Sequence, residues 1–174
     1  VAAEDLLQIE GLDVAAAVVR GGGSVKSYKR LLEKFVESHF ENHLIVRLPG
    51  LVGPGLRKNV VFDFLNNNNL HLIDSRGVFQ FYPMINLWYD LQIALKSRLK
   101  LVHLTAEPIS VAEIAREGFN RDFEQELDRL PARYDFRSIH AELFGGHGVY
   151  QYSRRESIQA IRAYAQSEPT REPS

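Results

Sequence analysis

The feature that most constrains this 174-residue chain is a helical pattern that leads at once into a short apolar strand and a Pro/Gly-rich turn. From Val25 to Phe40 apolar residues recur at three- and four-residue steps, which predicts a helix with one buried face. His43–Leu48 is a short apolar run typical of a buried strand, and Pro49 ends it. A helix followed directly by a buried strand predicts an α/β unit.

The rest of the chain continues this alternation, which favours an α/β fold over an all-α or an all-β one. An apolar stripe over Ala3–Arg20 predicts a first helix, which ends at the glycines of Gly21–Ser24. That GGGS tetrad is interpreted as a natural loop, an engineered linker or the place of a deleted segment. Later helices are expected over 59–66, 85–97, 110–119, 138–144 and 153–166, and later strands over 70–74, 78–82 and 99–105.

Composition narrows the class of protein. Hydrophobic residues make up 45% of the chain and charged residues 25%, as in an ordinary globular domain. The formal net charge of −1 favours neither a nucleic acid nor a membrane surface as partner. Because there is no cysteine, disulfides, thiolate nucleophiles and zinc–thiolate sites are excluded, which fits a reducing cytoplasm. No apolar run reaches the roughly 18 residues that a membrane-spanning helix needs.

Several phrases together resemble one known family. They are Lys29-x-x-x-Glu33 on the first strong helix, IVRLPGLVGPG over 45–55, KNVVFDFLN over 58–66, FQFYPMINLWYDLQIAL over 79–95 and SVAEIAREGF over 110–119. Their order and spacing resemble the extended short-chain dehydrogenases/reductases, the superfamily of NAD-dependent epimerases and dehydratases. The resemblance covers Val25 to about Tyr164. It implies a partial Rossmann-like α/β fold that lacks the N-terminal dinucleotide-binding half.

The resemblance also implies roles for individual residues. Lys29 matches the family's catalytic lysine, which holds the cofactor ribose and lowers the pKa of a tyrosine, since a nearby ammonium favours the phenolate. The cofactor's nicotinamide end is expected to lie against Arg47, Pro49 and Leu51. The substrate is expected to lie against Asn59, Phe79 and Tyr82. No metal site is expected.

Three departures limit what carries over. Val25 stands where the family has its catalytic tyrosine, and no strand carrying the family's catalytic serine is recognisable before it. No Gly-x-x-Gly-x-x-Gly follows a first strand, so the cradle for the dinucleotide phosphates is missing. Phe79 stands where nucleotide-sugar enzymes carry an arginine that pairs with the substrate diphosphate. We therefore expect no cofactor for this chain alone, and NAD or NADP for a full-length parent.

An aromatic concentration leaves two readings open. Phe79, Phe81, Tyr82, Trp88 and Tyr89 either line an apolar ligand pocket or belong to the core of strands and a helix.

The expected organisation is a helix and Gly-rich linker over 1–23, a substrate-binding lobe over 24–168 and a flexible tail over 169–174. The corresponding hypothesis is the substrate-recognition portion of an NAD-dependent epimerase/dehydratase-like protein, with no catalysis of its own. The alternative is an interaction module that forms a homodimer, or pairs with a cofactor-domain partner, through an exposed sheet edge.

Overall fold

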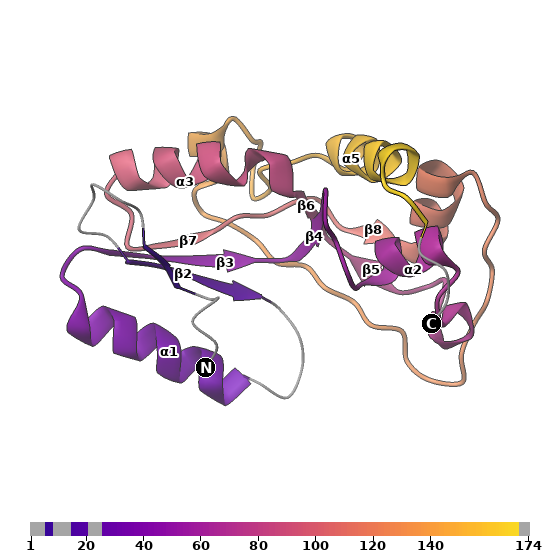
Figure 1. Ribbon diagram of the computed structural model, residues 1–174, viewed down its shortest axis with the longest axis horizontal. Helices are drawn as coiled ribbons and strands as arrows, with labels where there is room; N and C mark the ends of the chain where they lie inside the picture. Colours follow the sequence, from indigo (N-terminus) through magenta and orange to yellow (C-terminus); the bar gives the residue numbers. More distant parts are fainter. Residues whose placement is uncertain (1–5, 9–14, 21–25, 171–174) are drawn as a thin grey trace.

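A parallel sheet with helices on both faces forms one end of the molecule. The computed structural model describes residues 6–8, 15–20 and 26–170, and the side chains of residues 30–170. The sheet has the strand order β1-β2-β3-β7, in which β2, β3 and β7 are parallel and β1 is antiparallel to β2. The strands are β1 (Leu6–Gln8), β2 (Ala15–Arg20), β3 (His43–Leu48) and β7 (Leu101–His103). Helix α1 (Lys26–His39) covers one face and α3 (Leu87–Lys96) the other (Figure 1).

The alternation of side chains along β3 builds the core on both faces. Ile45 packs with Val36 of α1 on one side. Leu44 and Val46 point to the opposite face, because successive side chains of a strand alternate. There they join a second cluster completed by Leu48, Tyr82, Leu91, Ala94, Val102 and Leu104. Burial on both faces is typical of a parallel strand, which confirms the sequence prediction for 43–48.

The predicted helix over Ala3–Arg20 is wrong. Leu6–Gln8 and Ala15–Arg20 are strands, and every residue of β2 pairs in parallel with a residue of β3. Ladder pairing to a distant segment outweighs the helical spacing of apolar residues here, and Val18 and Val19 are β-branched residues that favour a strand. A strand does therefore precede α1, contrary to expectation, and β2-α1-β3 is one crossover unit. The tetrad Gly21–Ser24 lies outside the described residues.

A second group of elements lies beyond β3 and packs around its own core (Figure 1). Strand β4 pairs in parallel with β6, and β5 pairs antiparallel with β8. The elements are β4 (Gly50–Val52), α2 (Val60–Asn66), η2 (Leu70–Leu72), β5 (Val78–Phe79), β6 (Phe81–Pro83), η3 (Met84–Asn86), β8 (Ile109–Ser110), α4 (Val111–Glu113), the π-helical turn η4 (Ile114–Gly118), η5 (Ala141–Phe144) and α5 (Arg154–Ser167). The core buries Val61, Phe64, Phe81, Ile109, Ile114 and Ile161, with six further residues.

Two helix starts follow the sequence prediction, and one predicted strand does not. Ser110 and Ser153 each form a capping box with a glutamate three residues on. The expected strand over Leu70–Asp74 is instead the short 3-10 helix η2, entered through Asn69 at φ 49°. Left-handed backbone is tolerated by asparagine, and it turns the chain away from an extended path.

The helices of the described residues are short and mixed in polarity. The longest, α1 and α5, have 14 residues each. Within the ranges given above, none is long and apolar enough to span a membrane.

Candidate functional site

A charged cluster lies near the carboxyl end of the parallel strands. Arg47 of β3 donates from Nε to Glu33 Oε1 at 2.8 Å and from Nη2 to Oε2 at 2.7 Å. This is the bidentate fork that a guanidinium makes with a carboxylate. The hydrogen bonds from Arg47 lower the pKa of Glu33, although partial burial opposes them. Glu33 is thus an ionised residue of α1 that ties the helix to the sheet.

His103 of β7 extends this cluster. Arg47 Nη1 donates to His103 Nε2 at 3.2 Å, and the ring's Nδ1 donates to the carbonyl of Arg137 at 3.0 Å. Because a guanidinium only donates, Nε2 accepts and the proton sits on Nδ1. Burial lowers the pKa of His103, so its neutral form is favoured. We call Glu33, Arg47 and His103 the sheet-end cluster.

The sheet-end cluster lies where ligands of open α/β sheets bind, outside the carboxyl ends of the strands. All three guanidinium nitrogens of Arg47 contact protein partners, which holds the side chain in place. Pro49 separates β3 from β4, and Leu51 packs on the core beneath α3. Lys29 lies in α1, one helical turn before Glu33, but its side chain is outside the described ones, as is all of Val25. The roles predicted for Lys29, Arg47, Pro49 and Leu51 stay predictions.

A pocket of about 490 Å³ opens in the second group of elements. Its walls come from α2, the η2 turn, β5 and the segment 129–132. It is lined by Val60, Asp63, Leu72, Ile73, Asp74, Gly77, Phe79, Arg129, Leu130, Pro131 and Ala132. We call it the α2–β5 pocket. Its volume falls in the range of about 300–1,000 Å³ that small-molecule sites occupy.

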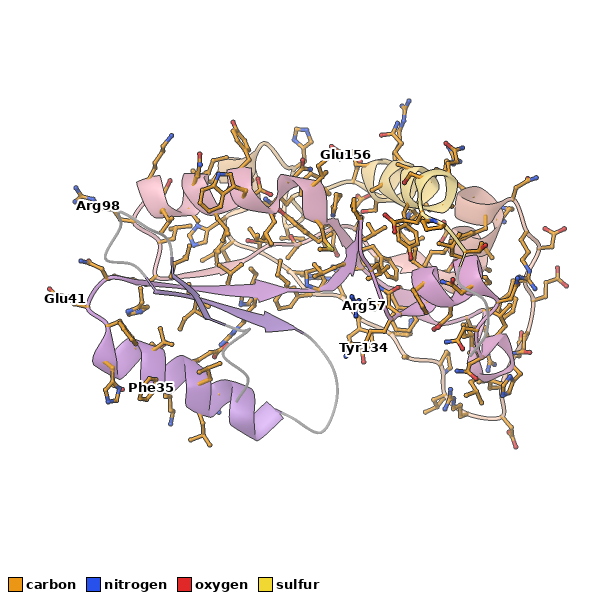
Figure 2. The ribbon with its side chains drawn as sticks, viewed as in Figure 1. Phe35, Glu41, Arg57, Arg98, Tyr134 and Glu156 are labelled. Carbon is orange, nitrogen blue, oxygen red and sulfur yellow. The ribbon has the colours of Figure 1, made fainter. Side chains whose placement is uncertain are left out.

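Phe79 is the predicted substrate residue that lines this pocket. Its ring stacks on Tyr134, with centroids 5.5 Å apart and planes 26° from parallel. Gly77 makes the close packing there achievable, because a Cβ at that position would come within 2.9 Å of the Phe79 ring. Figure 2 labels Tyr134, which lies on the segment that passes beneath the junction of the two halves of the molecule.

Tyr82 is placed elsewhere. It is fully buried, and its hydroxyl donates to Asp90 Oδ2 at 2.5 Å. Gln151 Nε2 and the Tyr152 hydroxyl donate to the same oxygen at 2.8 and 3.0 Å. Burial raises the pKa of Tyr82 and also that of Asp90. The five aromatic residues for which the sequence left two readings therefore divide into three groups. Phe81 and Tyr82 belong to the core, Phe79 lines a pocket, and Trp88 and Tyr89 are exposed on α3.

Asn59 caps α2. Its Oδ1 accepts from the backbone N–H groups of Val61 and Phe62, and its Nδ2 donates to the carbonyl of Leu51. The backbone at Asn59 has φ 130°, a region that favours glycine. Asn59 therefore anchors the pocket-lining helix to β4, and its predicted contact with substrate stays a prediction.

One segment connects the pocket with the sheet-end cluster. Tyr134 stacks on Phe79, while Phe136 stacks on His103 with ring centroids 4.4 Å apart. Between them, the buried Gln80 side chain holds Phe136 by two bonds, from Phe136 N at 2.6 Å and to Phe136 O at 2.8 Å. Nothing in the sequence pattern marks 134–136 for this role, because the bonds join residues 56 positions apart.

The described side chains form no cluster of the kind that binds a metal ion. No three His, Cys, Asp or Glu side chains in the part of the chain that the structure describes gather as a metal site. The two histidines near the end of α1 accordingly have no third ligand there. His39 instead stacks on Phe35.

Comparison with solved structures identifies the fold. It is that of the extended short-chain dehydrogenases/reductases, the NAD-dependent epimerases and dehydratases, which confirms the resemblance predicted from the sequence at the level of the fold. A UDP-galactose 4-epimerase structure matches with a TM-score of 0.57 and 13% identity, over 87% of this chain and 62% of that one. A dTDP-4-dehydrorhamnose reductase ortholog from Clostridium acetobutylicum matches with a TM-score of 0.61 and 16% identity, over 88% and 64%. A dTDP-glucose 4,6-dehydratase from Bacillus anthracis, solved with NAD, matches with a TM-score of 0.56 and 10% identity, over 82% and 50%.

The chain thus spans between 50% and 64% of the length of these three structures. No protein-family model and no curated protein matches the chain.

Proposed function

We propose that this chain is the substrate-recognition portion of an NAD(P)-linked protein of the epimerase/dehydratase class. A small molecule binds in the α2–β5 pocket, and the chain carries out no redox chemistry alone. The observation that carries the proposal is the pocket of about 490 Å³ beside Phe79, the residue to which the family resemblance assigns a substrate contact. Its position outside the parallel sheet suits a ligand that meets a cofactor held at the sheet's carboxyl ends.

The residues present do not fit a whole dinucleotide. The fold suggests NAD or NADP, and one neighbour, a UDP-glucuronic acid 4-epimerase from Bacillus cereus with a TM-score of 0.51, is solved with UDP-glucuronic acid and NAD. A dinucleotide needs a glycine-rich turn that lets its pyrophosphate approach the backbone at a helix N-terminus. The 174-residue sequence contains no Gly-x-x-Gly-x-x-Gly. Arg47 is also already paired with Glu33 and His103.

A nicotinamide-fluorescence titration tests this proposal. NADH added to the full chain at micromolar concentrations is expected to give no saturable change in emission, because the pyrophosphate has no glycine cradle. A saturable one-to-one isotherm with a micromolar or lower Kd would overturn the view that the chain lacks its own cofactor site. Lys29→Ala, which removes the predicted ribose contact, separates the two cases: it abolishes a true family-like site and leaves nonspecific quenching unchanged.

A second candidate function is an interaction module, and the surface of α1 favours it. Leu31 is 62% exposed and Phe35 is 49% exposed. Both lie on a different side of α1 from Val36, which is buried in the core. Phe35 lies on the outer side of the helix (Figure 2). In the described sheet β7 is an edge strand, which offers unpaired backbone groups. Light scattering tests this candidate. A homodimer that Phe35→Glu converts to a monomer would support it, and a clean monomer at high concentration would exclude its homodimer form.

A further inference from the structure

We propose that the α2–β5 pocket takes a neutral, ring-shaped apolar molecule with one hydroxyl group, and not a nucleoside diphosphate sugar. This inference rests on the proposed function and names the substrate class of the same site. It follows from the pocket walls, from an aromatic pair beside them and from one carboxylate with a free oxygen.

The pocket walls are mostly apolar. Val60, Ile73 and Pro131 line it, and two large side chains at its margin are left open to solvent. Leu72 is 57% exposed and Leu130 95% exposed. A ligand that covered these two leucines would remove their surface from water, which is the main favourable contribution to binding in a site of this kind.

The aromatic pair selects for a flat ring. Phe79 lines the pocket and stacks on Tyr134, which is itself 55% exposed. The bonds from Tyr134 N to Val78 O and from Val78 N to Ala132 O hold the backbone of this segment against β5. These bonds fix the backbone of the segment, and the stacked Tyr134 ring supports the Phe79 ring, so a ligand ring in the pocket meets a Phe79 ring that is already held in place. Aromatic pairs prefer offset or edge-to-face contact with a partner ring.

Asp63 supplies the polar contact. It lines the pocket from α2, and its Oδ1 accepts from Asn68 Nδ2 at 2.8 Å. Among the described residues its second oxygen, Oδ2, has no partner. Partial burial raises the pKa of Asp63, because the charged carboxylate loses contact with water there. A ligand hydroxyl that donates to this oxygen would restore part of the lost solvation.

The same groups disfavour a diphosphate. Of the described residues that line the pocket, Arg129 alone is cationic, and it donates to the carbonyl of Leu72. The nearby Arg76 donates to the carboxylate of Asp74, so this arginine also has a protein partner already. Phe79 takes the place of the arginine fork expected from the family. A diphosphate would therefore meet one cation and the unpaired oxygen of Asp63, a poor match for two or more negative charges.

Isothermal titration of the full chain with three probes tests the proposal. 2-Naphthol has a flat apolar ring and a hydroxyl that stays neutral at pH 7, as a phenol does. 2-Methoxynaphthalene has the same ring without the donor, and UDP-glucose represents the nucleotide sugars. 2-Naphthol is expected to bind about tenfold more tightly than its methyl ether, since a hydrogen bond to a charged group contributes about that factor.

Variants locate the effect. Asp63→Ala is expected to abolish the difference between the two naphthalenes, and Phe79→Ala to weaken both. The surface variant Tyr89→Ala on α3 leaves all affinities unchanged and serves as the control. Circular dichroism shows whether each variant is folded, and Asp63→Leu, which keeps the approximate shape of the side chain but has no acceptor, replaces Asp63→Ala if the latter unfolds.

The outcomes separate the inference from the proposed function. If UDP-glucose binds in a Phe79-dependent manner and 2-naphthol does not, the ligand class is wrong and the recognition role stands. If no probe binds, both fail. If the two naphthalenes bind equally well to the parent chain, the role given to Asp63 is wrong.

Discussion

The rings of His103 and Phe136 stack 4.4 Å apart and within 18° of parallel, so that the end of β7 is joined to a segment that also reaches the α2–β5 pocket. Gln80 holds the backbone of Phe136 by two hydrogen bonds. The pocket and the sheet-end cluster are therefore parts of one connected region, although they belong to different groups of elements.

Breaking the Arg47–Glu33 pair is expected to destabilise the chain. Arg47→Met leaves the Glu33 carboxylate, a residue only 8% exposed, without its fork, which costs about 2 kcal/mol in the free energy of unfolding. Urea denaturation of Arg47→Met, Glu33→Met and the double variant measures the coupling. The double variant is expected to be more stable than the sum of the two single losses predicts. Simple additivity would contradict a direct interaction.

His103 is expected to make stability fall as the pH drops below the ordinary histidine pKa of about 6.5. Its folded-state pKa lies below the unfolded value of about 6.5, so the unfolded chain binds the proton more readily. The free energy of unfolding therefore falls as the pH drops through 6.5. Protonation would also set the imidazolium against the guanidinium of Arg47. His103→Gln is expected to flatten this part of the profile, and an equal slope in both proteins would exclude His103 as the cause.

Asp90 is expected to tolerate asparagine and not leucine. Three donors, from Tyr82, Gln151 and Tyr152, converge on one oxygen of Asp90, which is 2% exposed. Asp90→Leu leaves all three without an acceptor and is expected to cost more than about 3 kcal/mol. Asp90→Asn keeps an acceptor oxygen, and burial already disfavours the charge, so its cost is expected to stay near 1 kcal/mol. Thermal unfolding ranks the two, and the reverse order would refute this network.

Asn59 is expected to be replaced better by glycine than by alanine. Alanine loses the cap bonds and keeps a Cβ at φ 130°, whereas glycine loses the bonds but accepts that backbone freely. Asn59→Gly is expected to be about 1–2 kcal/mol more stable than Asn59→Ala. The comparison also bears on substrate contact, since a purely structural Asn59 changes stability without changing the affinity of the Asn59→Gly variant for a pocket ligand.

Local patterns predicted the elements whose stability is local. The spacing of apolar residues predicted α1, and the helices expected to begin at residues 110 and 153 do begin there, each with a capping box. The strand β2 was missed because its conformation depends on pairing with β3, more than twenty residues away. Its alanines and valines suit either structure.

The candidate site was only partly predictable for the same reason. Phe79, to which the family resemblance assigns a substrate contact, lines the pocket, and the contact itself stays a prediction. Asp63, which also lines the pocket, was not singled out, because an acidic residue in the first turn of a helix ordinarily complements the helix dipole. Its contact with a ligand is a proposal. Gln80, Tyr134 and Phe136 were missed because their contacts join segments about 55 residues apart.

The most direct test of the central claim, that the α2–β5 pocket is the recognition site of this chain, is an amide chemical-shift titration with 2-naphthol. The expected result is a saturable set of shifts confined to α2, β5 and the segment 129–134, with Asp63 and Phe79 among the largest. Shifts that centre on α1 or α3, or no saturable shifts with either 2-naphthol or UDP-glucose at millimolar concentration, would contradict it.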